Sequence, residues 1–112
     1  MLFKPFHIPM IRSGLKVETR RLWKRWHVRE GGTYPAQDKF CKPRIECPII
    51  RCVARYQQRL GDMTEENAKM EGGYTLEQFQ GTFKAITGKW DSHLVVYVVR
   101  FEYIGEGEDI YG

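Results

Sequence analysis

The feature that most constrains the fold is the valine-rich stretch His93–Ile104. Between His93 and Arg100 it runs Leu-Val-Val-Tyr-Val-Val, and valine and tyrosine favour the extended backbone of a strand. Because the apolar residues follow one another without alternation, both faces of this strand need to be covered. The stretch therefore predicts a central strand, against which the rest of the chain has to place other strands and helices.

A second long strand is predicted at Ile49–Leu60, which ends at Gly61. Side chains in a strand point alternately to its two faces, so the residues separate into two sets. The set expected on the core face is Ile50, Cys52, Ala54 and Tyr56. The set expected to point outward is Ile49, Arg51, Val53, Arg55 and Gln57.

Shorter strands are predicted at Leu2–Phe6, Val17–Leu22 and Thr33–Gln37. The segment Trp23–Glu30 is compatible with either a short helix or an extension of the preceding strand. Asp38–Pro48 is predicted to be a loop, because two prolines and scattered charges interrupt it.

Three helices are indicated by their end signals. The first covers His7–Ser13 and ends at Gly14, with Ile8, Ile11 and Leu15 pointing inward. The second is capped by Asp62 or Thr64 and runs to Glu71, before Gly72-Gly73. The third begins with a capping box of Thr75 and Gln78, ends at Gly88, and has its apolar residues at helical spacing. These apolar residues, expected in the core, are Leu76, Phe79, Phe83 and Ile86.

Four or more strands with helices gathered in two places favour an α+β domain with a curled sheet or a small barrel. The length of 112 residues suits one domain, residues 1–112, with a frayed tail at 105–112. No apolar run approaches the roughly 20 residues of a membrane span. The first residues also lack a signal-peptide pattern, so we expect a cytoplasmic protein without a membrane partner.

Charge is distributed unevenly along the chain. Residues 4–59 contain 14 basic and 4 acidic residues, a net +10, whereas residues 60–112 contain 4 basic and 10 acidic residues, a net −6. With such a distribution, either the positive first half attracts a polyanion, or the charges of the two halves neutralise each other in the folded protein. The cations are clustered with aromatic residues, which favours the polyanion.

That cluster is the stretch Ser13–Arg29, where only Glu18 is acidic. Cations bind phosphates without regard to base sequence, and flat rings stack on bases, so RNA or a modified nucleoside is the expected partner. The residues predicted to bind nucleic acid, including two arginines of the second long strand, are Arg20, Arg21, Trp23, Lys24, Arg25, Trp26, Arg29, Arg51 and Arg55.

A metal site or another cofactor is not predicted. Three cysteines argue against a disulfide framework, and the spacing of Cys41 and Cys47 is not a familiar zinc spacing. Cys52 lies in an apolar strand and is expected in the core. A metal site would need His7, His27 or His93 to be brought in from elsewhere in the fold.

The order Gly14-Leu15-Lys16-Val17-Glu18-Thr19-Arg20-Arg21 resembles the Gly-x-Lys-x-x-Thr-x-Arg motif of the ASCH domain family, relatives of the PUA domain. The opening residues 2–5, the acidic helix at 63–71 with residues 74–77 behind it, and the strand at 94–103 are also similar to that family. The resemblance implies a small PUA-like β-barrel of about five to six strands, with two to four short helices at its openings.

The resemblance also implies a function. Some ASCH proteins are amidohydrolases that remove the acetyl group of N4-acetylcytidine with a lysine, a threonine and a glutamate. At the matching positions, Lys16, Thr19 and Glu71 are the expected catalytic residues. Other members are described as ribonucleases or only as RNA binders. A non-catalytic RNA-binding module and a ribonuclease therefore remain alternatives here.

Amide hydrolysis requires an activated nucleophile and an acid for the leaving amine. A Lys16 amine whose pKa is lowered by burial or by neighbouring arginines can accept the proton of Thr19, and Glu71 can then protonate the amine. Alternatively, Lys16 and Glu71 only form an ion pair. Lys16 and Thr19 have the wrong parity to share a face of one strand, so Lys16 is expected in the turn after Gly14 or beside a bulge.

Overall fold

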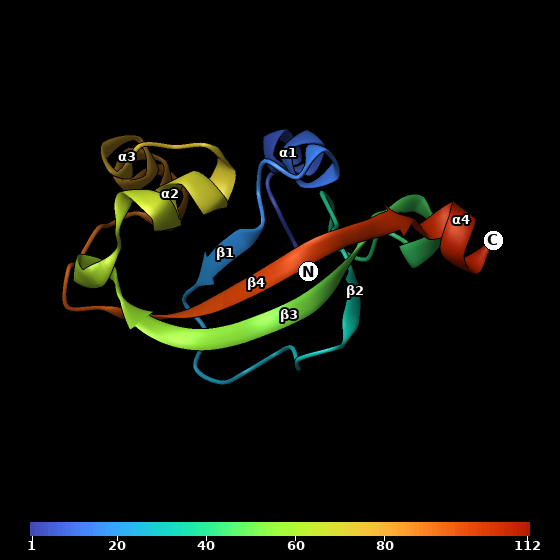
Figure 1. The fold of residues 1–112 in the computed structure, drawn as a ribbon, viewed down its shortest axis with the longest axis horizontal. Coiled ribbons are helices and arrows are strands. Elements are labelled where there is room, and N and C mark those ends of the chain that lie inside the picture. The colour runs from blue at the N-terminus through green and yellow to red at the C-terminus, as the bar shows by residue number, and fades with distance from the viewer.

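The fold is built on a four-stranded antiparallel sheet with the strand order β1-β4-β3-β2 in a computed structural model that describes residues 1–112 (Figure 1). The central strands β3 and β4 are long, whereas the two edge strands are short. The strands are β1 (Glu18–Arg21), β2 (Thr33–Pro35), β3 (Pro48–Arg59) and β4 (Val95–Glu106).

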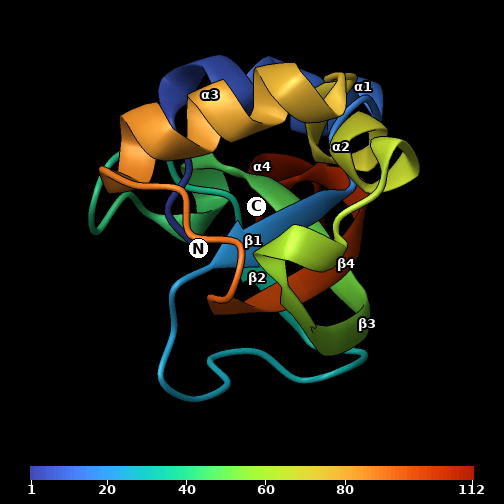
Figure 2. The same ribbon diagram turned by 90° about the vertical axis from the view of Figure 1, so that its left-hand side faces the viewer.

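Three of the four helices lie on one side of this sheet, and residues 22–32 cross the opposite side as an irregular segment (Figures 1 and 2). None of the helices has the length and hydrophobicity that crossing a membrane requires. The helices are α1 (Ile8–Ser13), α2 (Glu65–Gly72), α3 (Leu76–Thr87) and α4 (Gly107–Tyr111). Three short 3₁₀ turns are η1 (Pro5–His7), η2 (Arg44–Glu46) and η3 (Leu60–Asp62).

The predicted α+β class is confirmed, but the predicted barrel is wrong. The sheet has four strands, and its edge strands β1 and β2 do not pair with each other. The N-terminal segment Leu2–Phe6, predicted to be a strand, makes only a single parallel bridge from Leu2 to Gln37. Pro5 begins the turn η1 at once, so no further strand is available to close the sheet.

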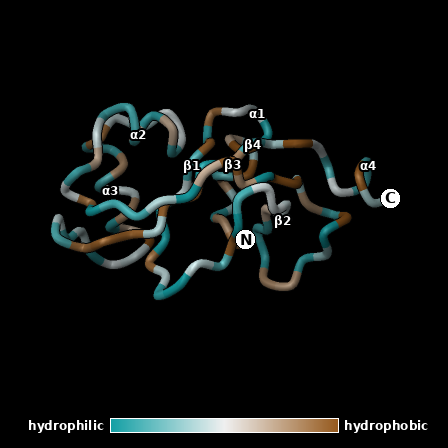
Figure 3. The backbone as a smooth tube through the Cα atoms, turned by 60° about the horizontal axis from the view of Figure 1, so that its bottom comes forward, coloured by the Kyte–Doolittle hydropathy of each residue, from teal (hydrophilic) through white to brown (hydrophobic).

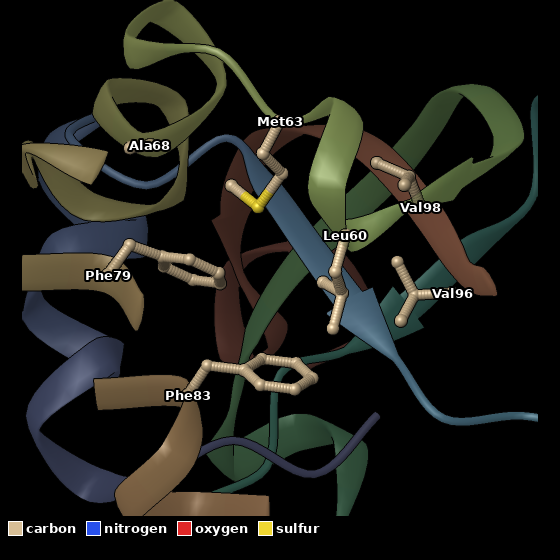
Figure 4. Packing of buried hydrophobic residues seen from close by; sticks show 7 residues of the cluster. All are labelled: Leu60, Met63, Ala68, Phe79, Phe83, Val96 and Val98. Atoms are coloured by element: carbon tan, nitrogen blue, oxygen red, sulfur yellow. The ribbon is translucent and has the colours of Figure 1, made fainter. Parts of the chain in front are cut away.

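Strand β4 is central, as its composition predicts. Val96 and Val98 are fully buried beneath α2 and α3, and Val99 is buried on the opposite face, where it packs against Val28. Further along the strand, Phe101 is buried against Ile8 and Ile11 of α1. In the close view of the first cluster, the rings of Phe79 and Phe83 point from α3 across β1 (Figure 4). Apolar contacts on both sides explain why a run of valines is stable here.

Strand β3 follows its predicted alternation with one exception. Ile50 and Cys52 are buried, and the predicted outward set from Arg51 to Gln57 is exposed. Ile49, predicted to point outward, is fully buried. Register irregularities between Ile49 and Ile50 and between Cys52 and Ala54 allow neighbouring residues to face the interior together.

The helix ends agree with the predicted caps. Thr64 and Thr75 each accept a hydrogen bond from the backbone of the residue three positions later, and Gly88 ends α3 in a left-handed conformation. Helix α2 is largely hydrophilic (Figure 3), and its buried residues are Ala68, Glu71 and Gly72. A buried glutamate on a polar helix indicates a specific partner, because an isolated charge is costly to bury.

Further expectations differ from the structure, and Ile86, which is expected in the core, is 43% exposed. Leu15, predicted to point inward, is 48% exposed because α1 ends before it and the chain turns at Gly14. At 105–112, predicted to be a frayed tail, the structure has regular secondary structure: β4 continues to Glu106 and α4 follows. The backbone N–H of Gly107 donates to the carbonyl of Cys47, which ties this end to the start of β3.

Candidate functional site

A pocket of about 480 Å³ lies beside the edge strand β1, between α3 and N-terminal residues 2–7. Aromatic side chains from α3 and the N-terminal segment line part of it, and polar side chains from β1, α2 and the turn before β1 line the rest. The three predicted catalytic residues all line this pocket. Its polar residues discussed below are His7, Lys16, Thr19, Arg20, Arg21 and Glu71.

Lys16 lies in the turn between α1 and β1, as its strand parity requires. Gly14 ends α1 in a left-handed conformation, and the backbone N–H of Lys16 then donates to the carbonyl of Met10. Its side chain is buried, and its Nζ donates to Oε1 of Glu71 at 2.8 Å and to the main-chain oxygen of Glu71 at 2.9 Å. Burial lowers the pKa of Lys16, an effect that Glu71 partly opposes.

Glu71 lies in the last turn of α2 and is shared between two cations. Its Oε1 accepts from Lys16, and its Oε2 accepts from Nη1 of Arg20 at 2.8 Å. The side chains of all three residues are at most 3% exposed. The carboxylate is therefore positioned from both sides and is screened from water.

Thr19 and Arg21 form the second part of the site. Nε of Arg21 donates to Oγ1 of Thr19 at 3.0 Å, so the threonine hydroxyl is an acceptor in this contact and its own proton remains free to be donated. The guanidinium of Arg21 lies 4.7 Å from the ring centroid of Phe3. Burial lowers the pKa of Arg21.

Arg20, which is predicted to bind nucleic acid, lines the pocket and is buried. All its side-chain donor contacts are to other side chains. Its Nη1 donates to Glu18 and Glu71, and its Nε and Nη2 both donate to Oε1 of Gln58. The reason for its burial is its position on β1: residues 18, 19 and 20 are all buried, because both faces of this short edge strand are covered.

His7 is a pocket residue for which the sequence predicts no role in this site. Its Nε2 lies 3.1 Å from the hydroxyl of Tyr74, and its ring is mostly buried. Burial and the nearby cations Lys16 and Arg21 lower the pKa of His7 to about 4. A lone histidine before a short helix carries no sequence signal for such a position.

The aromatic residues of the basic stretch are partly packed against the sheet. Trp23 and Trp26 are half-buried and both contact Tyr97 of β4, with ring centroids 6.2 and 4.7 Å from it. The guanidinium of Arg55 lies over the ring of Trp26, and its Nη1 donates to the carbonyl of Val28. These contacts fix the irregular segment 22–32 on the sheet.

The remaining predicted nucleic-acid contacts lie on the surface. Lys24, Arg25 and Arg29 are exposed, and none of them forms an ion pair. Arg51 is also exposed, but it pairs with Glu102 at 3.2 Å. The structure thus leaves three exposed cations of the basic stretch without an acidic partner.

The cysteines do not form a site together. Cys52 is buried, as predicted, and so is Cys47, whereas Cys41 is exposed. No group of three or more histidine, cysteine, aspartate or glutamate side chains is arranged to hold a metal ion.

Comparisons of the chain with known proteins give a match by structure only. No protein-family model matches the sequence, and no curated protein matches it significantly. The structure is similar to an ASCH domain from Lactobacillus crispatus JV V101, with a TM-score of 0.76, 14% identity, and coverage of 90% of this chain and 72% of the other. It is also similar to a protein of family model DUF984 from Enterococcus faecalis V583, with a TM-score of 0.63, 18% identity, and coverage of 87% and 69%. The chain therefore has an ASCH-like fold, as the sequence motif predicts.

Proposed function

We propose that this protein binds RNA or a modified nucleoside in the pocket beside β1 and hydrolyses an amide of the N4-acetylcytidine type. The observation that carries the proposal is the buried Lys16–Glu71 pair, which shares a pocket with Thr19. The ASCH-like fold also supports it. The motif that resembles the ASCH family contains Lys16 and Thr19, and both residues line the pocket.

The size and walls of the pocket suit a nucleoside. A volume of about 480 Å³ lies within the range of roughly 300–1,000 Å³ that small-molecule sites occupy. Phe79 and Phe83 line it from α3 and Phe3 lines it from the N-terminal segment, so a flat base has apolar rings beside it. The polar groups of β1 then face the substituents of the base.

The chemistry begins with Thr19 as nucleophile and Lys16 as base. A neutral amine has two N–H bonds and one lone pair; both N–H bonds of Lys16 are accounted for by Glu71, so the lone pair is left for the proton of Thr19. The threonine oxygen attacks the acetyl carbonyl, and the negative charge forms on the carbonyl oxygen. The guanidinium of Arg21, which lies beside the threonine oxygen, then stabilises this charge.

The leaving group is the amine of cytosine. When the C–N bond breaks, the lysine ammonium returns the proton to this amine, and water then hydrolyses the acetyl-threonine ester. From the resemblance we expect Glu71 to be the acid. In this geometry both its carboxylate oxygens accept hydrogen bonds from cations, so a role in positioning Lys16 fits better.

The test is turnover of N4-acetylcytidine by the wild type and by Thr19→Val, with Thr82→Val as the matched control. Thr82 also lines the pocket but is not part of the proposed chemistry. We expect Thr19→Val to lose at least about 100-fold in turnover while still binding the nucleoside, because the nucleophile is removed. Equal turnover by wild type and Thr19→Val, or equal losses in both variants, would contradict the proposal.

A second candidate is an RNA-binding module without hydrolase activity. The three exposed, unpaired cations Lys24, Arg25 and Arg29 favour it, because they lie beside Trp23 and Trp26 on one irregular segment. Salt-sensitive binding of a short RNA, with no turnover of N4-acetylcytidine or RNA, would select this function. Cleavage of the RNA that is lost in Lys16→Met would indicate a ribonuclease.

A further inference from the structure

We propose that Arg20 is a positioning residue: it holds the carboxylate of Glu71 so that Lys16 can lose its proton without leaving a buried carboxylate unpaired. The consequence for catalysis rests on the proposed function, in which Lys16 is the base. The electrostatic claim itself concerns the ionisation of Lys16 and can be tested in the absence of any substrate.

The inference starts from a chain of contacts between buried charges. Nζ of Lys16 lies 2.8 Å from Oε1 of Glu71, and Oε2 of Glu71 lies 2.8 Å from Nη1 of Arg20. The same nitrogen of Arg20 lies 3.0 Å from Oε1 of Glu18, whose Oε2 lies 2.8 Å from Nη2 of Arg100. The side chains of Arg20 and Glu18 are fully buried, and Arg100 reaches the surface.

The number of charges in this chain explains what Arg20 does. Two carboxylates, Glu71 and Glu18, face three cations, so one cation can become neutral while each carboxylate keeps an arginine partner. Arginine does not lose its proton in proteins, which leaves Lys16 as the cation that can. Without Arg20, a neutral Lys16 would leave Glu71 as an uncompensated buried charge, which is strongly unfavourable.

Arg20 is itself held in place from the sheet. Its Nε and Nη2 donate to Oε1 of Gln58 at 3.0 and 2.9 Å, and Nε2 of Gln58 donates to Oδ1 of Asn67 at 3.1 Å. Asn67 also belongs to the capping box of α2. Strand β3 and the start of α2 therefore both position the guanidinium that contacts Glu71.

Other titratable and charged groups also lie around Lys16. Arg21 of β1 lowers the pKa of Lys16 as Arg20 does, while burial is the largest cause and Glu71 opposes all three. His7 of η1 faces Lys16 as a neutral imidazole at neutral pH, because its own pKa is about 4. Lys4 and Asp38 also line the pocket.

The test is the pKa of Lys16 in two variants that change opposite charges. Arg20→Met removes a cation beside Glu71 and should raise the pKa of Lys16 by about one, which is a tenfold fall in the neutral fraction at a given pH. Glu18→Gln removes an anion beside Arg20 and should lower this pKa by a smaller amount. The pKa is measured by NMR titration of the side-chain resonances of Lys16, which are assigned with Lys16→Met.

Opposite shifts are the result that a purely structural role of Arg20 would not produce. Arg51→Met is the control, because it removes an arginine from an exposed ion pair with Glu102 and should leave Lys16 unchanged. Arg20→Lys keeps the charge and should restore a pKa near that of the wild type. If Arg20→Met does not fold, Glu18→Gln decides alone: a lowered pKa supports the inference, and an unchanged or raised pKa overturns it.

The activity assay separates this inference from the proposed function. Turnover of N4-acetylcytidine should rise with pH as Lys16 loses its proton, and Arg20→Met should move the midpoint upward by about one pH unit. If the pKa of Lys16 shifts as expected but neither the wild type nor a variant turns over N4-acetylcytidine, the proposed function is overturned and the role of Arg20 is kept. Turnover together with an unchanged pKa of Lys16 in Arg20→Met and Glu18→Gln would support the proposed function and overturn the role of Arg20.

Discussion

The two halves of the basic stretch Ser13–Arg29 differ in how the structure treats their charges. In the first half, Lys16 and Arg20 are buried and contact carboxylates at 2.8–3.0 Å. In the second half, Lys24, Arg25 and Arg29 are exposed and unpaired. A buried cation requires a partner because it has lost its water, whereas an exposed cation keeps its water until a polyanion replaces it. Cations that look alike in a sequence are therefore suited to the two different roles proposed above, chemistry in a pocket and attraction of a phosphate backbone.

The largest effect is expected when the ion pairs of the buried half are broken. Glu71→Gln leaves the charges of Lys16 and Arg20 without one of their carboxylates, and we expect it to reduce the free energy of unfolding by about 3 kcal/mol. The measurement is urea denaturation at pH 7. Glu77→Gln is the control, because this glutamate of α3 is exposed. Losses of similar size in the two variants would show that the cluster around Glu71 is not desolvated as described.

The second largest effect tests whether the exposed half binds RNA. Replacing Lys24, Arg25 and Arg29 together by glutamine should weaken binding of a short single-stranded RNA at least about tenfold and reduce the slope of log affinity against log salt by about 2. The measurement is fluorescence anisotropy at several salt concentrations. The matched control replaces three exposed lysines elsewhere, Lys69, Lys84 and Lys89, and has the same net charge. Equal losses in both variants would mean that RNA responds to net charge alone.

The smallest effect concerns His7, which lines the same pocket as Lys16 and carries no charge at neutral pH. Its pKa is about 4 in the fold, well below the value of 6.5 that is usual for a histidine. Between these values the unfolded chain binds more protons, so stability falls as the pH decreases from about 6.5 to about 4. His7→Gln should remove about 1 kcal/mol of this decrease, after allowance for solvent screening.

Denaturation at pH 7 and pH 4 measures this difference. His93→Gln is the control, because this histidine is exposed. An unchanged pH dependence in His7→Gln would show that the imidazole is protonated as easily in the fold as in the unfolded chain.

Local chemistry in the sequence predicts much of the fold. The run of valines in β4 requires two covered faces, and the capping residues Thr64 and Thr75 set the starts of α2 and α3. In contrast, the closure of the sheet and the burial of Ile49 were predicted incorrectly. Both depend on how strands meet and on irregularities in β3, which are not local properties.

The candidate site shows the same division. The motif spacing and the resemblance to ASCH domains single out Lys16, Thr19 and Glu71, and the ASCH-like fold places them around one pocket. The partnership of Arg20 with Glu18, Glu71 and Gln58 was not predicted, because β1 is buried on both faces only after the helices pack on the sheet.

The sequence by itself determined the positions of the main helices, the central place of β4 and the concentration of positive charge in the first half. These properties follow from backbone preferences, side-chain alternation and charge, which act over a few neighbouring residues. Only the tertiary structure decided which cations are buried, which carboxylates they contact and where the pocket opens. Burial and ion pairing depend on residues more than 50 positions apart, such as Lys16 and Glu71, and distance in the sequence carries no information about such a contact.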